Sequence, residues 1–176
     1  MGWALERPAR EPATARCLAE SLHELESRFL TAFIREVLRW RPPVVDAVRQ
    51  LIQLMEFADY RIPAGILTVV APLLAPGNAE STSSSEALQP CRFLNTVEPV
   101  RNWIPFGGAR RYCLGAELAV LQMEVILSQL IGAVTLSPAR PRVETARLLG
   151  TVAVPSRGSL AVIHRKAPSR SRGPCA

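Results

Sequence analysis

Cysteine and histidine are scarce in this sequence. Its 176 residues include four cysteines, no two of which form a C-x-x-C pair, so we expect no structural zinc site. The sequence begins without a signal-peptide pattern, which argues against a disulfide framework. The two histidines, His23 and His164, have no partner motif, and we interpret both as structural or surface residues.

The sequence also lacks an uninterrupted apolar run of ~18 residues, the length that a membrane-spanning helix needs. The nearest candidate runs from Leu114 to Ile131 and is followed by Gly132, a predicted C-cap. Glu117, Gln122, Glu124 and Gln129 interrupt it. We interpret it as a core helix that is apolar on most sides, and we expect no membrane anchor.

Positive charge is concentrated near the C-terminus. The formal net charge is +6, and five basic residues with no acidic residue follow Pro155, so the residues before that point carry a net charge of +1. We predict that residues 1–166 form the folded part and that residues 167–176 form a disordered basic tail. No nucleic-acid recognition module accompanies this tail, so we expect no nucleic-acid partner.

One cysteine stands in a setting suited to a metal-bound thiolate. Gly107 and Gly108 precede Cys113, and glycine lets a backbone approach a ligand face that a Cβ would block. We expect the following helix to start at Cys113, where its N–H groups and dipole would stabilise a sulfur anion. Arg111 can form forked hydrogen bonds to a carboxylate. The alternative is a buried free cysteine beside a glycine turn.

Residues 106–115 resemble the haem-binding signature of the cytochrome P450 family, Phe-x-x-Gly-x-Arg-x-Cys-x-Gly. Phe106, Arg111, Cys113 and Gly115 occupy its fixed positions, and Ala109 stands where the family usually has glycine. The resemblance implies that Cys113 is the axial thiolate ligand of haem b. It further implies that Arg111 binds a propionate, that Phe106 shields the sulfur, and that the loop glycines lie against the haem.

A second motif lies near the end of a predicted amphipathic helix over residues 14–40. The apolar positions of this helix are Leu18, Leu22, Leu25, Phe29, Phe33 and Val37. Glu36 and Arg39 lie three residues apart and therefore share one face. Taken alone, they could be an ordinary surface ion pair worth about 0–1 kcal/mol.

Residues 36–43, however, are similar to the Glu-x-x-Arg helix of the P450 family and the Arg-Pro-Pro that follows it. The family pairs this Glu and Arg with an arginine of a Pro-x-Arg-Phe segment, which is residues 90–93 here. The resemblance thus implies a structural network of Glu36, Arg39 and Arg92. It also makes Arg49 a candidate for the second propionate, because the family often has an arginine at this distance.

The expected fold class is mainly α with small β-hairpins, an α+β arrangement like the C-terminal portion of the P450 fold. We predict a turn at 60–65 followed by a strand at 66–70, and a hairpin that pairs residues 151–154 with 160–163. The resemblance covers roughly residues 3–165, so residues 1–166 would be a partial domain that holds the proximal half of the haem site. The distal oxygen-activating helix is missing, so we assign no catalytic residue.

The resemblance implies a haem-thiolate monooxygenase that inserts one oxygen atom from O2 into a small, apolar organic substrate. A ferredoxin or flavoprotein would donate electrons after docking near Arg101, Arg110 and Arg111. The bacterial type of the resemblance implies a cytoplasmic protein. Since the chain holds only part of the family's domain, the alternative is a truncated haem-binding remnant without activity. A small basic interaction protein is a third possibility.

Overall fold

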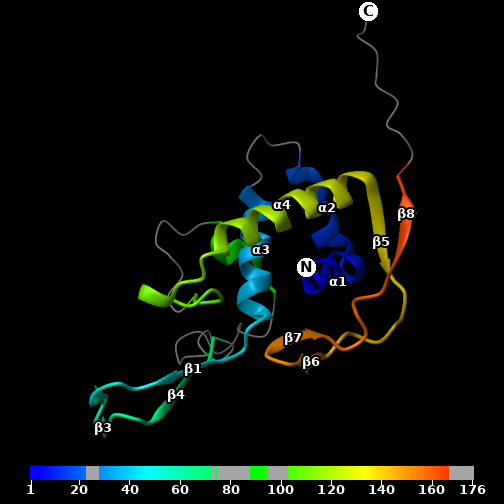
Figure 1. Ribbon diagram of the computed structural model, residues 1–176. Coiled ribbons are helices and arrows are strands. Elements are labelled where there is room, and N and C mark those ends of the chain that lie inside the picture. Colours follow the sequence, from blue (N-terminus) through cyan, green and yellow to red (C-terminus); the bar gives the residue numbers. More distant parts are fainter. Residues whose placement is uncertain (23–27, 73, 75–87, 95–102, 167–176) are drawn as a thin grey trace, which may run out of the picture.

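The computed structural model describes residues 1–22, 28–72, 74, 88–94 and 103–166 (Figure 1). Four helices form its body: α1 (Gly2–Arg10), α2 (Pro12–Ser21), α3 (Arg28–Trp40) and α4 (Ala116–Ala133). Short 3-10 helices, η2 (Pro90–Phe93) and η3 (Ala109–Arg111), precede α4. The predicted tail, His23, Leu25 and Arg101 lie outside the described residues.

The prediction of one helix over residues 14–40 is wrong. Helix α2 begins earlier, at Pro12, where proline loses no helical hydrogen bond, and it ends at Ser21. The Ser21 hydroxyl donates to the carbonyl oxygen of Leu18 at 2.8 Å, a local bond that competes with helix continuation. A new helix, α3, then carries the Glu-x-x-Arg motif.

The core forms where α3 crosses α4 and the two N-terminal helices. Phe33 and Ile34 of α3 are fully buried, as are Leu18 of α2 and Leu127 of α4. Trp3 of α1 joins the same cluster. Burying an apolar side chain of this size contributes about 1.5–3 kcal/mol, so this cluster holds α3 in place as the central element.

Two nested antiparallel ladders extend away from the helices between α3 and η2 (Figure 1). Strand β1 (Ala47–Gln50) pairs with β4 (Leu67–Val70), with Ala47 opposite Val70. Inside this ladder, β2 (Met55–Phe57) pairs with β3 (Tyr60–Ile62). The strand near 66–70 is therefore present, but residues 60–62 form a strand rather than a turn. The turn that joins β2 to β3 has Ala58 at φ +49°.

The four C-terminal strands do not pair as predicted. Strand β6 (Ala146–Leu149) pairs with β7 (Val152–Pro155), while β5 (Val134–Pro138) pairs with β8 (Ala161–Arg165). The hairpin between 151–154 and 160–163 is thus wrong. Gly150, at φ +62°, starts a two-residue turn that returns β7 onto β6, and turns of this length favour positive φ.

Helix α4 also differs from its prediction. It begins at Ala116 with Gly115 as its N-cap, three residues after Cys113, and it continues past Gly132 to Ala133. It buries Ala116, Met123, Leu127 and Ile131 and leaves Leu118, Leu121, Val125 and Ile126 exposed. Among the described residues, α4 is the one helix long and apolar enough to cross a membrane by length and composition. Most of its residues are not buried by the described part of the chain, so the interpretation of this segment as a core helix does not hold within that part.

Candidate functional site

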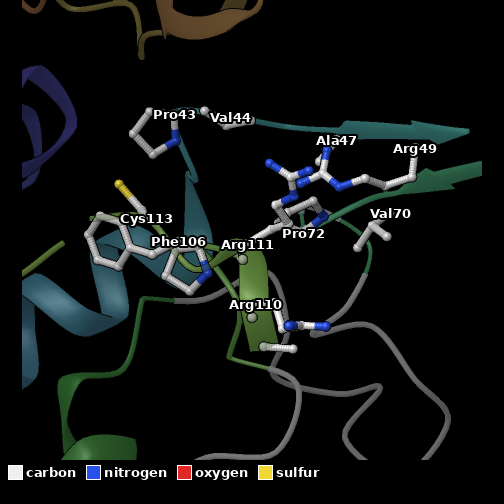
Figure 2. Close-up of a pocket in the computed structure, with 14 residues that line it drawn as sticks. Pro43, Val44, Ala47, Arg49, Val70, Pro72, Phe106, Arg110, Arg111 and Cys113 are labelled. Carbon is white, nitrogen blue, oxygen red and sulfur yellow. The ribbon is translucent and has the colours of Figure 1, made fainter. Parts of the chain in front are cut away.

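A cavity of about 620 Å³ lies between the start of the β1–β4 ladder and the loop that leads to α4. Its lining combines Pro43 and Val44, which follow α3, with residues of both strands and of the loop. The lining includes Cys113, Arg49 and Arg111. Figure 2 shows the Cys113 sulfur on one side of this pocket and the guanidinium groups of Arg49 and Arg111 together on the other. The structure thus gathers three predicted site residues from two distant segments.

The main chain of the Cys113 loop closes on itself. The N–H of Cys113 donates to the carbonyl oxygen of Phe106 at 3.0 Å, and the N–H of Gly107 donates to the carbonyl oxygen of Ile104 at 3.0 Å. Phe106 packs against the edge of the core, whereas Cys113 is exposed. These bonds hold the loop that contributes Cys113 to the cavity lining.

Helix α4 does not begin at the cysteine, contrary to the prediction. The first helical hydrogen bond instead runs from the N–H of Ala119 to the carbonyl oxygen of Gly115 at 2.9 Å. The carbonyl oxygen of Cys113 accepts a hydrogen bond from Ala116 at 3.2 Å, so the sulfur lies just before the first turn of α4.

Backbone conformation explains two positions of the loop. Gly107 has φ +76°, a conformation that glycine adopts at little cost. Ala109 has φ +49°, so the residue that departs from the family signature occupies a conformation that favours glycine. A Cβ built on Gly108 would meet no atom within 4 Å, which leaves open space beside this stretch of the cavity lining.

The arginines at the cavity come from different elements. Arg49 lies on β1, and its Nη1 donates to the carbonyl oxygen of Val48 at 2.8 Å. Arg110 and Arg111 lie on η3. Figure 2 shows the Arg110 guanidinium apart from the other two. Arg49 and Arg111 therefore form one local concentration of positive charge, as a dianionic ligand edge would require.

Glu36 is fully buried and lies at the centre of an ion network. Arg39 donates to both of its carboxylate oxygens at 2.7 Å, a bidentate pair. The Nε of Arg92 lies 3.6 Å from Glu36 Oε2, and the backbone N–H of Gln89 donates to Oε1 at 2.9 Å. The structure thus brings together Glu36, Arg39 and Arg92 and joins α3 to η2 through them.

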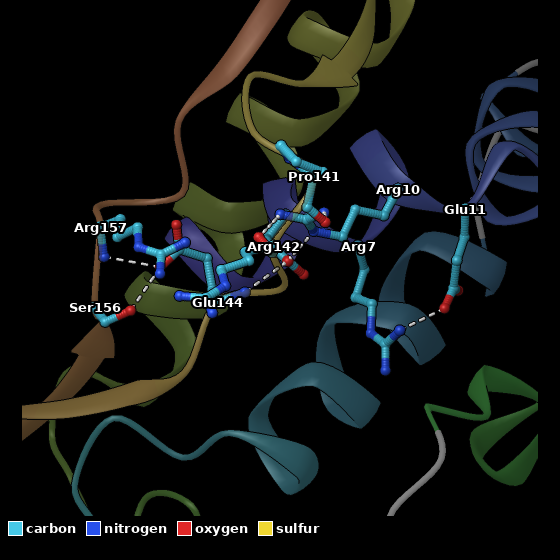
Figure 3. Close-up of polar contacts among 9 residues, drawn as sticks. Arg7, Arg10, Glu11, Pro141, Arg142, Glu144, Ser156 and Arg157 are labelled. Atoms are coloured by element: carbon cyan, nitrogen blue, oxygen red, sulfur yellow. Dashed lines mark hydrogen bonds and ion pairs between the residues drawn. The ribbon is translucent and has the colours of Figure 1, made fainter.

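A second polar cluster ties α1 to the segment between β5 and β6, and ties that segment to the residues that follow β7 (Figure 3). Arg10 donates to the carbonyl oxygens of Pro141 at 3.1 Å and Arg142 at 2.5 Å. Glu144 Oε2 accepts a hydrogen bond from the backbone N–H of Arg157 at 2.8 Å. None of these residues lines the cavity, and their contacts serve to dock the C-terminal strands on the helical body.

Aromatic rings and arginines stack where α3 ends. The guanidinium carbon of Arg41 lies 4.2 Å from the ring centroid of Trp40 and 5.4 Å from that of Trp3. Burial lowers the pKa of Arg41 and the nearby Arg7 adds to this, while Glu6 opposes it. None of the three stacked residues is part of the cavity lining.

Sequence reasoning missed Trp103. Its Nε1–H donates to the carbonyl oxygen of Arg35 at 3.0 Å, and its ring lies between those of Phe93 and Phe106. The sequence shows a tryptophan three residues before Phe106. It does not show the partner of that tryptophan, Arg35 on α3, because the two residues are 68 positions apart.

Comparison with known proteins identifies the family. The family model described as cytochrome P450 matches residues 22–160. A relative named cytochrome P450 135B1, from Mycobacterium tuberculosis, is 34% identical over 168 residues, which cover 90% of this chain and 35% of the relative. Another M. tuberculosis relative, named cytochrome P450 137, is 33% identical over 132 residues, covering 74% of this chain and 28% of its own length.

A solved structure shows the same fold. Retinoic acid bound cyanobacterial CYP120A1 is similar to this chain with a TM-score of 0.79 and 23% sequence identity, over 88% of this chain and 39% of that protein. The chain spans about a third of the length of the curated relatives it matches. Its mixture of helices and small antiparallel sheets matches a P450 over part of that fold. The chain belongs to the cytochrome P450 family.

Proposed function

We propose that this chain is the proximal, thiolate-bearing part of a cytochrome P450 monooxygenase. In this proposal residues 1–166 are a partial domain that corresponds to the C-terminal part of the full fold. The observation that carries it is the shared cavity, in which Cys113, Arg49 and Arg111 face an apolar space of about 620 Å³. A cavity of this size is within the range of protein sites for organic ligands and cofactors.

The cavity fits haem b in three respects. One sulfur, that of Cys113, is available as a ligand, and among the described residues no three His, Cys, Asp or Glu side chains gather to bind a metal. A metal at Cys113 would therefore take its other ligands from a group such as a porphyrin. Arg49 and Arg111 would pair with the two propionates, and the open space beside Gly108 would admit the edge of a flat ring.

In this site the protein would bind and orient the haem and would shield the Cys113 sulfur from water. Cys113 would supply the thiolate, and Phe106 would pack beside the sulfur and limit its contact with water. Gly115, at the N-cap of α4, lies beside Cys113, and a Cβ there would make an ordinary contact with the sulfur at 4.0 Å. The haem, when bound, supplies the chemistry that inserts one atom of dioxygen into an organic substrate.

The expected electron donor and substrate follow from the family and from the positive charge beside the Cys113 loop. An acidic ferredoxin or flavoprotein would dock beside the loop, where Arg110 is exposed, and donate electrons. The substrate would be a small apolar organic molecule, and the protein would act in the cytoplasm of a bacterium, as its relatives are bacterial. No catalytic residue is assigned, because the oxygen-activating helix is expected outside this chain.

A second candidate is a haem-binding remnant without activity. Under either candidate this chain leaves the apolar side of α4 exposed, where Leu118, Leu121 and Val125 lie uncovered by the described residues. In a P450 of full length the remaining two thirds would cover such a surface. The two candidates share the Cys113 site and differ only in whether the rest of the domain is supplied.

Thiol protection tests the site directly. The purified chain is mixed with hemin and treated with iodoacetamide, and alkylation of each cysteine is quantified by mass spectrometry. We expect hemin to protect Cys113 and to leave Cys17 and Cys91, which are also exposed, reactive. Reactivity of Cys113 that is the same with and without hemin, as for Cys17 and Cys91, would exclude Cys113 as the ligand in this chain.

A further inference from the structure

We propose that Trp103 is a positioning residue that fixes the Cys113 loop against the turn of α3 that carries Glu36 and Arg39. This role deepens the proposed function, because it concerns the placement of the proposed haem ligand. Trp103 is only partly buried and is not among the residues that line the cavity. It would therefore act on Cys113 indirectly, through the loop.

The first set of contacts joins Trp103 to α3. The indole Nε1–H donates to the main-chain oxygen of Arg35 at 3.0 Å, and the Arg35 guanidinium carbon lies 5.9 Å from the indole centroid. A carbonyl oxygen has two lone pairs, so it accepts this bond in addition to a helical one. Arg35 directly precedes Glu36, so Trp103 attaches at the helical turn that carries the buried ion network.

The second set joins Trp103 to the loop and to η2. Its ring makes edge-to-face contacts with Phe93 at 6.0 Å and with Phe106 at 6.2 Å. Phe93 follows Arg92, a member of the ion network, and the carbonyl oxygen of Phe106 accepts the hydrogen bond of Cys113. Trp103 is therefore the point where α3, η2 and the thiolate loop meet.

The loop needs such an anchor because it has little burial of its own. Cys113 and Arg111 are exposed, and segments with few buried contacts open locally at low cost. A metal ligand must be held within a fraction of an ångström of its working position, usually by contacts beyond the ligand itself. The indole provides both a directional hydrogen bond and a packed ring. Phenylalanine would lose the hydrogen bond, and alanine would lose both.

Hydrogen exchange on the chain without haem tests this role. The reporters are the amides of Cys113 and Gly107, which donate to Phe106 and Ile104, each normalised to amides in the middle of α4. We expect Trp103→Phe, which keeps a ring but loses the Nε1–H bond, to speed loop exchange about fivefold relative to α4. Trp103→Ala should speed it about tenfold or more.

Trp3→Phe is the matched control. Trp3 is buried, its Nε1 has no hydrogen-bond partner among the described residues, and it lies outside the cavity lining. This variant should leave the ratio of loop to α4 exchange unchanged. If Trp103→Phe has no effect on the ratio, or if both Trp103 variants speed loop and α4 exchange equally, Trp103 is an ordinary packing residue and the proposal is overturned.

Haem-loaded chain gives a second, spectroscopic result. Trp103→Phe should lower the fraction of the reduced carbon monoxide complex with the thiolate-type band, while Trp3→Phe should not. An unchanged fraction would contradict the role of Trp103 toward the ligand. If the unsubstituted chain binds no haem, the proposed function fails, and the exchange ratio still decides whether Trp103 positions the loop.

Discussion

The backbone N–H of Cys113 and the carbonyl oxygen of Phe106 form a 3.0 Å hydrogen bond that closes the loop beside the cavity. The rings of Phe106 and Tyr112 meet edge to face at 6.4 Å across the same closure. Because main-chain bonds fix the loop, its shape depends on backbone angles as much as on side chains. The positive φ values of Gly107 and Ala109 are therefore part of the site.

Ala109→Gly should stabilise the chain. Ala109 has φ +49°, and a non-glycine residue in this region costs roughly 1–2 kcal/mol. Glycine removes that cost but gives the unfolded chain more freedom, so we expect a net gain of about 0.5–1 kcal/mol. Chemical denaturation followed by circular dichroism measures the free energy of unfolding.

Ala58→Gly is the matched control, because Ala58 also has φ +49° but lies in the β2–β3 turn. Both variants should gain similar stability, while only Ala109→Gly should change hemin affinity. A loss of stability in Ala109→Gly would show that this φ is not strained in solution.

Glu36→Ala should destabilise the fold strongly. The substitution removes the shared partner of Arg39 and Arg92 from a buried site, and breaking such a network typically costs about 3–5 kcal/mol. We expect thermal unfolding at much lower temperature, and loss of hemin binding as a consequence. Glu56→Ala removes an exposed pair with Arg61, with side chains 71% and 74% exposed, and should change little. Similar effects of the two substitutions would contradict a structural network at Glu36.

Arg49→Ala and Arg111→Ala should each weaken hemin binding without unfolding the chain. A hydrogen bond to a charged group contributes about 1.5–3 kcal/mol, so we expect a loss of about tenfold or more per substitution. Arg61→Ala, on the exposed β3 strand, serves as the control. Titration with hemin dimethyl ester, which has no propionate charge, should remove the difference between these variants and the unsubstituted chain. A difference that persists with the ester would assign the arginines another role.

Local motifs were readable from the sequence. Glu36 and Arg39 share a helix, and the Cys113 loop is one short segment, so fixed spacing alone placed their side chains near one another. The cytochrome P450 family and the mixture of helices with small hairpins are confirmed. The assignment of Cys113, Arg111 and Arg49 to haem remains a prediction, which their shared cavity supports.

Long-range pairing was not readable in the same way. From the sequence, β8 could pair with the preceding strand β7 or with β5. The β-branched residues in these strands favour strand formation but do not specify which strand is the partner. The bond from Trp103 to Arg35 joins segments 68 positions apart. The start of α4 at Ala116 depends on the loop hydrogen bonds that hold Cys113 outside the helix. Each of these features is decided by tertiary packing.

The most direct test of the central claim is the absorption spectrum of the reduced carbon monoxide complex of the hemin-loaded chain. We predict the red-shifted band of a thiolate-ligated haem for the unsubstituted chain and for Cys91→Ser, and its loss in Cys113→Ser. The spectrum of free or imidazole-ligated haem in the unsubstituted chain, or a red-shifted band that survives in Cys113→Ser, would contradict the assignment of Cys113 as the haem ligand.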